Sequence, residues 1–329
     1  MIRAFKTDLD MLIIIFSIAF LAVLPTIYNN YFFINSLFLA SIYMISSTAW
    51  NILGGYTGLI SFGHAAFFGL GAYVLTISYN AGISPWLGIL IAGLVPSIFA
   101  LTISPPLLRL KGHWFALASI AVAEALKLFF NNWEYVGGAR GIELSRREYS
   151  IYWIYFVEPT SYNYIALIFT AASIVSMQAI VRSRIGYYLQ SIRESEETAM
   201  SVGIDPFRYK AIAMVISAFF TGVSGALYAL RYRYVDPFST MDLFISVQIC
   251  LIAIVGGVYS FSGPMLGALT IVPIAEYFRA FIGGAYGARF FGIHLLVYGL
   301  VLLCLSLYAP GGIIDAIRKR LPRPIASRA

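Results

Sequence analysis

Long apolar stretches separated by short polar segments run through most of the chain. About ten of them match the roughly 20 residues that a helix needs to cross a hydrocarbon core of about 30 Å. Backbone groups in lipid must bond within their own segment, and these stretches lack the alternation of barrel strands. The chain is therefore predicted to be an all-α, polytopic integral membrane protein. The expected spans are 11–28, 31–49, 59–79, 84–108, 113–130, 151–181, 208–230, 243–258, 263–282 and 289–308.

Composition supports lipid as the solvent. Of the 329 residues, 60% are hydrophobic and only 11% charged, which leaves too little polar surface to coat a water-soluble globule. The formal net charge is +7, but the basic residues are dispersed among apolar spans, so we expect no nucleic-acid partner. Placing both termini in the cytoplasm, with a basic tail at 311–329, puts more than half of the 22 Lys and Arg residues on that side, as the positive-inside rule favours.

Motifs for chemistry are sparse. An intramembrane enzyme needs a nucleophile with a base, or a metal cluster. His64, His113 and His294 are far apart in sequence, and neither H-E-x-x-H nor G-x-S-x-G occurs, although folding can still bring distant residues together. Cys250 and Cys304 both lie in apolar segments. We predict no catalytic residue, metal or bound cofactor, and without G-x-x-x-x-G-K-[ST] any ATP hydrolysis must come from a separate subunit.

A polar interruption at 182–210 is predicted to hold a short cytosolic helix over about 187–203. It lacks Gly and Pro as far as residue 202, and Gly203 is placed to end the helix in a left-handed conformation. Asp205 and Pro206 then fit the N-cap and first position of the next membrane helix. The expected apolar face consists of Tyr188, Ile192, Ala199 and Val202.

Residues 193–204, Arg-Glu-Ser-Glu-Glu-Thr-Ala-Met-Ser-Val-Gly-Ile, resemble the cytoplasmic coupling loop of ABC importer permeases. The branched-chain branch has a pattern close to E-x-E-x-A-A-x-x-x-G-I, and Thr198 stands where Ala is usual. The glycine-rich stretch at 50–73 and the Gly256-Gly257 region are similar to the same family. Over roughly residues 40–310 the chain resembles the branched-chain amino-acid ABC permeases, called LivM-like.

The resemblance implies one permease domain over 1–329, in a multi-pass protein of the bacterial plasma (inner) membrane. Its implied partners are cytosolic ATP-binding subunits that use ATP, a second and different permease chain, and an extracytoplasmic substrate-binding protein. The implied cargo is leucine, isoleucine or valine. Urea, short amides and other amino acids remain open, as does an ion-coupled secondary transporter. The residues implied in coupling to the ATPase are Arg193, Glu194, Glu196, Glu197, Ala199 and Gly203.

Six glycines between 54 and 71 are too many for a continuous helix, since each costs about 1 kcal/mol relative to Ala. Either a helix break lines the substrate path or small residues allow close helix packing, and both interpretations stand. His64 either contacts substrate or bonds a carbonyl that holds the break, and we favour the structural role. The candidate pathway residues are Gly58, Ser61, Gly63, His64, Gly256 and Gly257.

Two apolar spans carry charges three residues apart, Glu124 with Lys127 and Glu276 with Arg279. An unpaired charge at the bilayer centre costs about 3 kcal/mol on insertion scales, so each couple is expected to pair. Each pair either lines the pathway or lies at the membrane interface.

Overall fold

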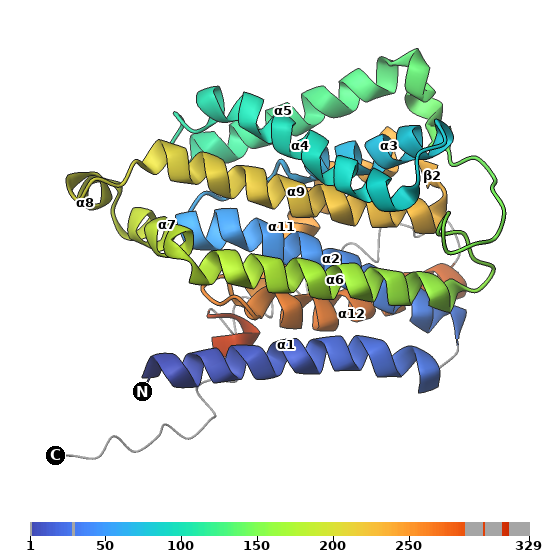
Figure 1. Cartoon of the computed structure of the whole chain (residues 1–329), viewed down its shortest axis with the longest axis horizontal. Helices are drawn as coiled ribbons and strands as arrows, with labels where there is room; N and C mark the ends of the chain where they lie inside the picture. Colours follow the sequence, from blue (N-terminus) through green and yellow to red (C-terminus); the bar gives the residue numbers. More distant parts are fainter. Residues whose placement is uncertain (1, 28–29, 287–298, 300–310, 316–329) are drawn as a thin grey trace.

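The computed structural model describes residues 2–27, 30–286, 299 and 311–315, and within them long helices form one bundle (Figure 1). Nine of the ten predicted spans correspond to long helices, and the tenth, 289–308, lies outside the described part apart from residue 299. In the described residues, seven helical segments are long and apolar enough to cross a membrane. The long helices are α1 (Ile2–Ile27), α2 (Tyr31–Thr57), α3 (His64–Asn80), α4 (Pro85–Leu107), α5 (His113–Asn132), α6 (Pro159–Arg182), α9 (Pro206–Tyr232), α11 (Leu243–Gly257) and α12 (Gly263–Tyr286).

Short elements lie at the two ends of this bundle (Figure 1). The N-terminal end of α1 lies at the same end as α7 (Arg184–Glu194) and α8 (Glu196–Ser201). At the opposite end, β1 (Ile142–Glu143) pairs antiparallel with β2 (Tyr234–Val235). The remaining short elements are η1 (Glu134–Val136), η2 (Gly138–Arg140) and α10 (Pro237–Thr240).

Four predicted boundaries need correction. The spans expected to begin at 11 and 59 begin at Ile2 and His64. The expected span at 151–181 begins only at Pro159, because Pro suits the first helical position and Glu158 before it is extended. The preceding residues form turns closed by a bridge between Ser150 and Tyr155. The expected end of the second span at 49 is also wrong, since α2 continues to Thr57.

Helix α9 is mostly buried and touches α3 backbone to backbone. A Cβ on Gly71 would lie 2.1 Å from the carbonyl oxygen of Gly222, and one on Gly225 would lie 1.9 Å from that of Phe68. Only glycine permits this approach. Lipid provides no hydrophobic driving force between helices, so close backbone packing of this kind holds α3 and α9 together. The small-residue interpretation therefore holds for α3.

The predicted single helix over 187–203 is in fact two helices. Ser195, with φ −163° and ψ 117°, leaves α7 and caps α8, where its hydroxyl accepts a hydrogen bond of 3.2 Å from the amide of Thr198. A serine that bonds the backbone locally competes with an unbroken helix.

The predicted stops of this segment are present. Gly203 has φ +84°, its amide donates to Met200, and the next amide reaches back to Ala199, which together close α8 in a Schellman motif. Asp205 then caps α9 by accepting from the amides of Phe207 and Arg208, with Pro206 at the first position.

Candidate functional site

The α7–α8 segment has an attached face and an open face. Ile192 and Ala199 are buried against the bundle. Glu197 is exposed, as are Met200 at 54% and Val202 at 71%. Val202 was expected on the apolar face with Ile192 and Ala199, but it is exposed, because α8 ends at Ser201 and Val202 is its C-cap. An exposed surface of one acidic and two apolar side chains is suited to contact another protein.

The attached face is held by charged side chains. Arg193 donates a hydrogen bond of 3.0 Å to the carbonyl oxygen of Gly55, in the last turn of α2. Its guanidinium also lies 5.0 Å from the ring centre of Tyr259. Lys210 of α9, with a side chain only 6% exposed, pairs with Glu196. The segment is thereby bonded to α2, to α9 and to the turn between α11 and α12.

The six predicted coupling residues thus divide into two groups. Arg193, Glu196 and Ala199 attach the segment to the bundle, and Gly203 shapes its end. Glu194 and Glu197 point outward, although Glu194 also pairs with Arg193 at 2.7 Å. Contact of the last two with an ATPase stays a prediction.

A break between α2 and α3 contains the candidate pathway residues Gly58, Ser61 and Gly63, and the fourth, His64, is the first residue of α3. Gly58, at φ +78°, ends α2 in the left-handed conformation, and α3 begins at His64. The indole N–H of Trp50 donates a hydrogen bond of 2.7 Å to the carbonyl oxygen of Ser61. The hydroxyl of Ser119 accepts a hydrogen bond of 2.9 Å from the amide of Phe62. Protein groups thus satisfy much of the freed backbone in this conformation.

His64 is fully buried and its Nε2 lies 2.7 Å from the hydroxyl of Ser217 on α9. The favoured structural role therefore has a partner, although it is a side-chain hydroxyl and not a carbonyl. Gly63 is restricted as well, since a Cβ there would lie 2.9 Å from the Ser119 carbonyl oxygen. A substrate role for these two residues stays a prediction.

The glycines at the end of α11 lie in close packing. A Cβ on Gly256 would lie 2.0 Å from the carbonyl oxygen of Gly263. Gly257 has φ +126° and a Cβ there would lie 2.4 Å from Ile314. Both glycines border the turn into α12, where backbones touch, and their place in a substrate path stays a prediction.

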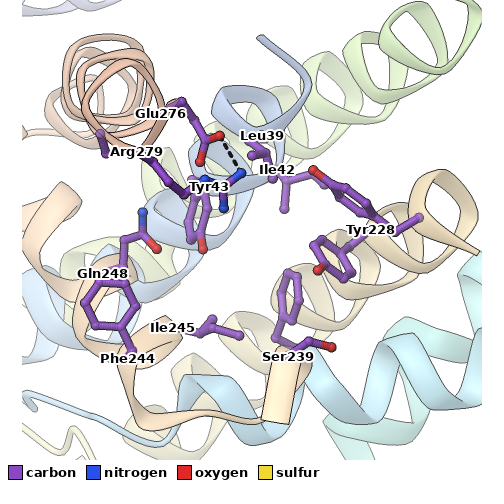
Figure 2. A pocket seen from close by; sticks show the side chains of 13 residues that line it. Leu39, Ile42, Tyr43, Tyr228, Ser239, Phe244, Ile245, Gln248, Glu276 and Arg279 are labelled. Carbon is purple, nitrogen blue, oxygen red and sulfur yellow. Dashed lines mark hydrogen bonds and ion pairs between the residues drawn. The ribbon is translucent and has the colours of Figure 1, made fainter. Parts of the chain in front are cut away.

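A cavity of about 340 Å³ opens elsewhere, among α2, α3, α9, α10, α11 and α12 (Figure 2). None of the six candidate pathway residues lines it, whereas Glu276 and Arg279 do. Sequence reasoning singled out this pair by its charges, but it had no signal for the surrounding residues. The lining consists of Leu39, Ile42, Tyr43, Phe68, Tyr228, Tyr232, Ser239, Phe244, Ile245, Gln248, Ala275, Glu276 and Arg279.

Polarity in the cavity is unevenly distributed. Leu39, Ile42 and Phe68 are buried and form an apolar wall. Glu276 and Arg279 lie together at one side in Figure 2 and bond at 2.7 Å, with side chains 12% and 53% exposed. The site therefore offers one shielded negative charge, one accessible positive charge and an apolar wall.

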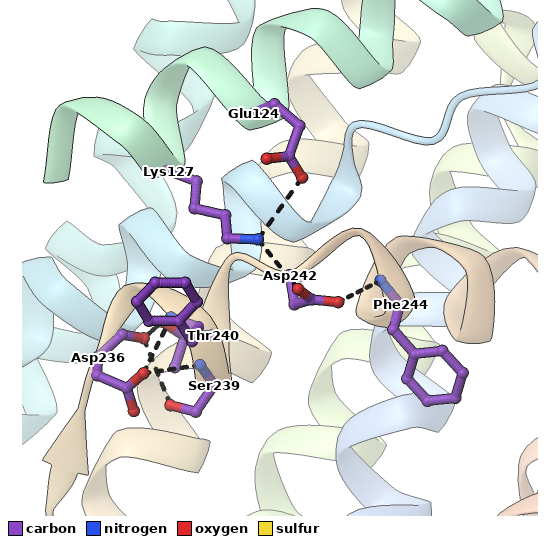
Figure 3. Close-up of polar contacts among 8 residues, drawn as sticks. Glu124, Lys127, Asp236, Ser239, Thr240, Asp242 and Phe244 are labelled. Atoms are coloured by element: carbon purple, nitrogen blue, oxygen red, sulfur yellow. Dashed lines mark hydrogen bonds and ion pairs between the residues drawn. The ribbon is translucent and has the colours of Figure 1, made fainter. Parts of the chain in front are cut away.

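In the other predicted pair, Glu124 with Lys127, the lysine lies closer to a different carboxylate. Lys127 lies 3.7 Å from Glu124 but 3.0 Å from Asp242, which sequence reasoning did not single out (Figure 3). The other carboxylate oxygen of Asp242 accepts a hydrogen bond of 2.9 Å from the amide of Phe244 and so caps the N-terminus of α11. Lys127 thus joins α5 to the start of α11, and the pair does not line the cavity of Figure 2.

Within the described residues, a bundle with seven helices of membrane-spanning length and composition defines a polytopic helical membrane protein. The family model described as "Branched-chain amino acid transport system / permease component" matches residues 32–306. Since this range spans most of the chain, the chain belongs to that family of ABC transporter permeases.

Curated relatives agree with this assignment. The chain is 27% identical to the Escherichia coli (strain K12) high-affinity branched-chain amino acid transport system permease protein LivM, over 86% of this chain and 70% of the relative. It is 25% identical to LivH of the corresponding system of Salmonella typhimurium, over 74% and 83%. It is also 22% identical to the nucleoside ABC transporter permease protein NupC of Lactococcus lactis subsp. cremoris, over 64% and 71%.

Proposed function

We propose that this chain is the membrane-spanning permease subunit of an ABC importer that carries branched-chain amino acids across the bacterial plasma membrane. Separate cytosolic subunits hydrolyse ATP, a second, different permease chain completes the pathway, and an extracytoplasmic protein delivers the cargo. The supporting observation is the α7–α8 segment, which combines an exposed surface with firm attachment to the bundle. Family membership removes the support for an ion-coupled secondary transporter.

The attachments suggest how ATP-driven motion enters the membrane. A force on Met200 or Val202 passes through α8 to Lys210 of α9, and through Arg193 of α7 to α2. Helix α2 packs on α9, and α9 packs on α3, where glycines of both helices bring the two backbones into contact. A displacement of α7–α8 therefore moves buried helices as rigid bodies, as alternating access requires.

The end of the bundle that carries α7 and α8 is the cytoplasmic end in this proposal. The N-terminal end of α1 lies at that end as well (Figure 1). The β1–β2 end then faces the delivering protein. This orientation agrees with the distribution of Lys and Arg along the sequence.

For the cargo, LivM and LivH favour leucine, isoleucine and valine, while the likeness to NupC makes nucleosides the second candidate. Urea, short amides and other amino acids are further candidates. The test is uptake of labelled leucine, uridine and urea by cells that carry the ATPase, binding-protein and partner permease genes, with and without this chain. Saturable leucine uptake that disappears on deletion supports the proposal. Loss of uridine or urea uptake alone overturns the cargo. If the deletion lowers the uptake of none of these three compounds, and of no other amino acid or short amide, the transport function itself is overturned.

A further inference from the structure

The cavity of Figure 2 is built for a molecule with two opposite charges and an aliphatic body. We propose that it binds the whole zwitterion of an aliphatic α-amino acid. In this arrangement Glu276 accepts hydrogen bonds from the ammonium group, Arg279 donates to the carboxylate, and the side chain lies on Leu39 and Ile42. The inference rests on the proposed amino-acid cargo and adds the residues that hold it.

Charge placement is the first argument. Ionisable groups within a membrane helix are costly, and they are retained where they serve a pathway or a ligand. Glu276 is largely shielded, and the residue three positions on supplies its counter-charge at 2.7 Å. A zwitterion brings one group for each charge, so it can insert between them without leaving either one unpaired. A guanidinium matches a carboxylate with two parallel hydrogen bonds.

Shape is the second argument. A volume of about 340 Å³ lies at the lower end of the roughly 300–1,000 Å³ typical of small-molecule sites. Its apolar wall is buried, whereas Ser239, Phe244 and Arg279 are exposed at its rim. An aliphatic side chain therefore reaches the closed wall while the charged head stays near the opening. A neutral nucleoside, urea or amide carries no charged group that could pair with Glu276 or Arg279.

Location is the third argument. Tyr228 and Tyr232 line the cavity, and Tyr232 is followed within two residues by β2. The cavity thus lies in the half of the bundle away from α7 and α8. In the proposed orientation this half faces the protein that delivers cargo, so the site is reached before the bundle rearranges.

The test measures equilibrium binding of labelled leucine to the purified complex of both permeases and the ATPase subunits. Leucinol, which lacks the carboxylate, and 4-methylpentanoate, which lacks the ammonium, compete for the site. We expect each to bind at least about tenfold more weakly than leucine to the unmodified complex. In Arg279→Gln the advantage of leucine over leucinol disappears, and in Glu276→Gln its advantage over 4-methylpentanoate disappears.

Glu124→Gln is the matched control, since it removes a carboxylate from the other i,i+3 pair of a membrane helix. It should bind all three compounds as the unmodified complex does. Ala275→Phe fills the cavity but keeps both charges, and it should abolish leucine binding. Nucleotide hydrolysis by each complex verifies assembly.

Failure of this inference is distinct from failure of the proposed cargo. If the unmodified complex transports leucine but does not bind it, or if both charge variants weaken the three compounds equally, the cavity is not the head-group site. If the unmodified complex transports no branched-chain amino acid at all, the proposed function itself fails.

Discussion

Arg193 of α7 bonds the carbonyl oxygen of Gly55 at 3.0 Å, which places a cation at the C-terminal end of α2. The carbonyls of a last helical turn lack helical partners, and a positive charge complements the negative end of the helix dipole. The same guanidinium lies 5.0 Å from the ring of Tyr259. One side chain therefore connects the surface segment to α2 and to the α11–α12 turn.

Replacing Arg193 by Lys should uncouple the surface segment from the membrane helices. Lysine keeps the charge but lacks the planar group that bonds Gly55 and stacks on Tyr259 together. We expect ATP-driven uptake in proteoliposomes to fall about tenfold, with basal ATP hydrolysis within about twofold of normal. Arg184→Lys is the control, because it makes the same replacement at an exposed position of α7 outside the predicted coupling residues. Normal uptake by Arg193→Lys would contradict the coupling role.

Glu197→Arg should abolish ATP-driven uptake while the protein stays folded. Glu197 is exposed on the open face of α8, so a reversed charge there changes docking and leaves the bundle intact. Association of the permease with its ATPase subunits, measured by co-purification, should fall together with uptake. Thr198→Ser, at an exposed neighbour, is the control. Unchanged uptake would remove the main support for docking at α8.

Glu196→Gln should lower thermal stability, unlike Glu197→Gln. Its carboxylate is the partner of Lys210, whose side chain is 6% exposed and would be left as a buried, unpaired cation. Because Glu196 is itself 37% exposed, we expect a cost of about 1–2 kcal/mol, below that of a fully buried pair. Thermal unfolding of the solubilised protein measures the difference. Equal melting temperatures of the two variants would show that the pair does not stabilise the segment.

Asp242 should matter more as a helix cap than as an ion-pair partner. Asp242→Asn keeps the oxygen that accepts from Phe244 but loses the charge that faces Lys127. Asp242→Ala loses both contacts and should be about 1 kcal/mol less stable than Asp242→Asn. Denaturation of the two variants, with Lys127→Met to complete a double-mutant cycle, separates the contributions. If the two variants are equally stable, the cap contributes nothing measurable.

Gly71→Ala should destabilise the bundle by about 1–3 kcal/mol, because its methyl group would lie 2.1 Å from the carbonyl oxygen of Gly222 and would push α3 from α9. Gly88→Ala meets only the side chains of Leu75 and Ser78, at 3.1 Å, and these can adjust. Thermal unfolding of both variants checks the difference. A larger loss in Gly88→Ala would contradict the packing argument.

The sequence by itself determined the features that depend on neighbouring residues and on the solvent. In lipid, the polar backbone groups of long, non-alternating apolar stretches are satisfied by helices, so the positions of nine long helices followed from those stretches. Gly203 and the Asp205-Pro206 couple predicted their helix boundaries correctly, since caps and left-handed turns are local. Ser195 was missed because serine favours N-caps but also occurs inside helices, and the sequence does not show whether its hydroxyl bonds a nearby amide.

Only the tertiary structure decided which distant polar groups meet. Arg193 and Gly55 are 138 residues apart, and Lys127 and Asp242 are 115 apart. A polar group in lipid must find a partner, but helix sequences do not specify on which neighbouring helix that partner lies. The cavity follows the same logic, because its lining comes from six helices whose rotations are set by close contacts such as that of Gly71 with Gly222. The three-residue spacing of Glu276 and Arg279 in an apolar span therefore predicted that they pair, and packing decided that they face a cavity.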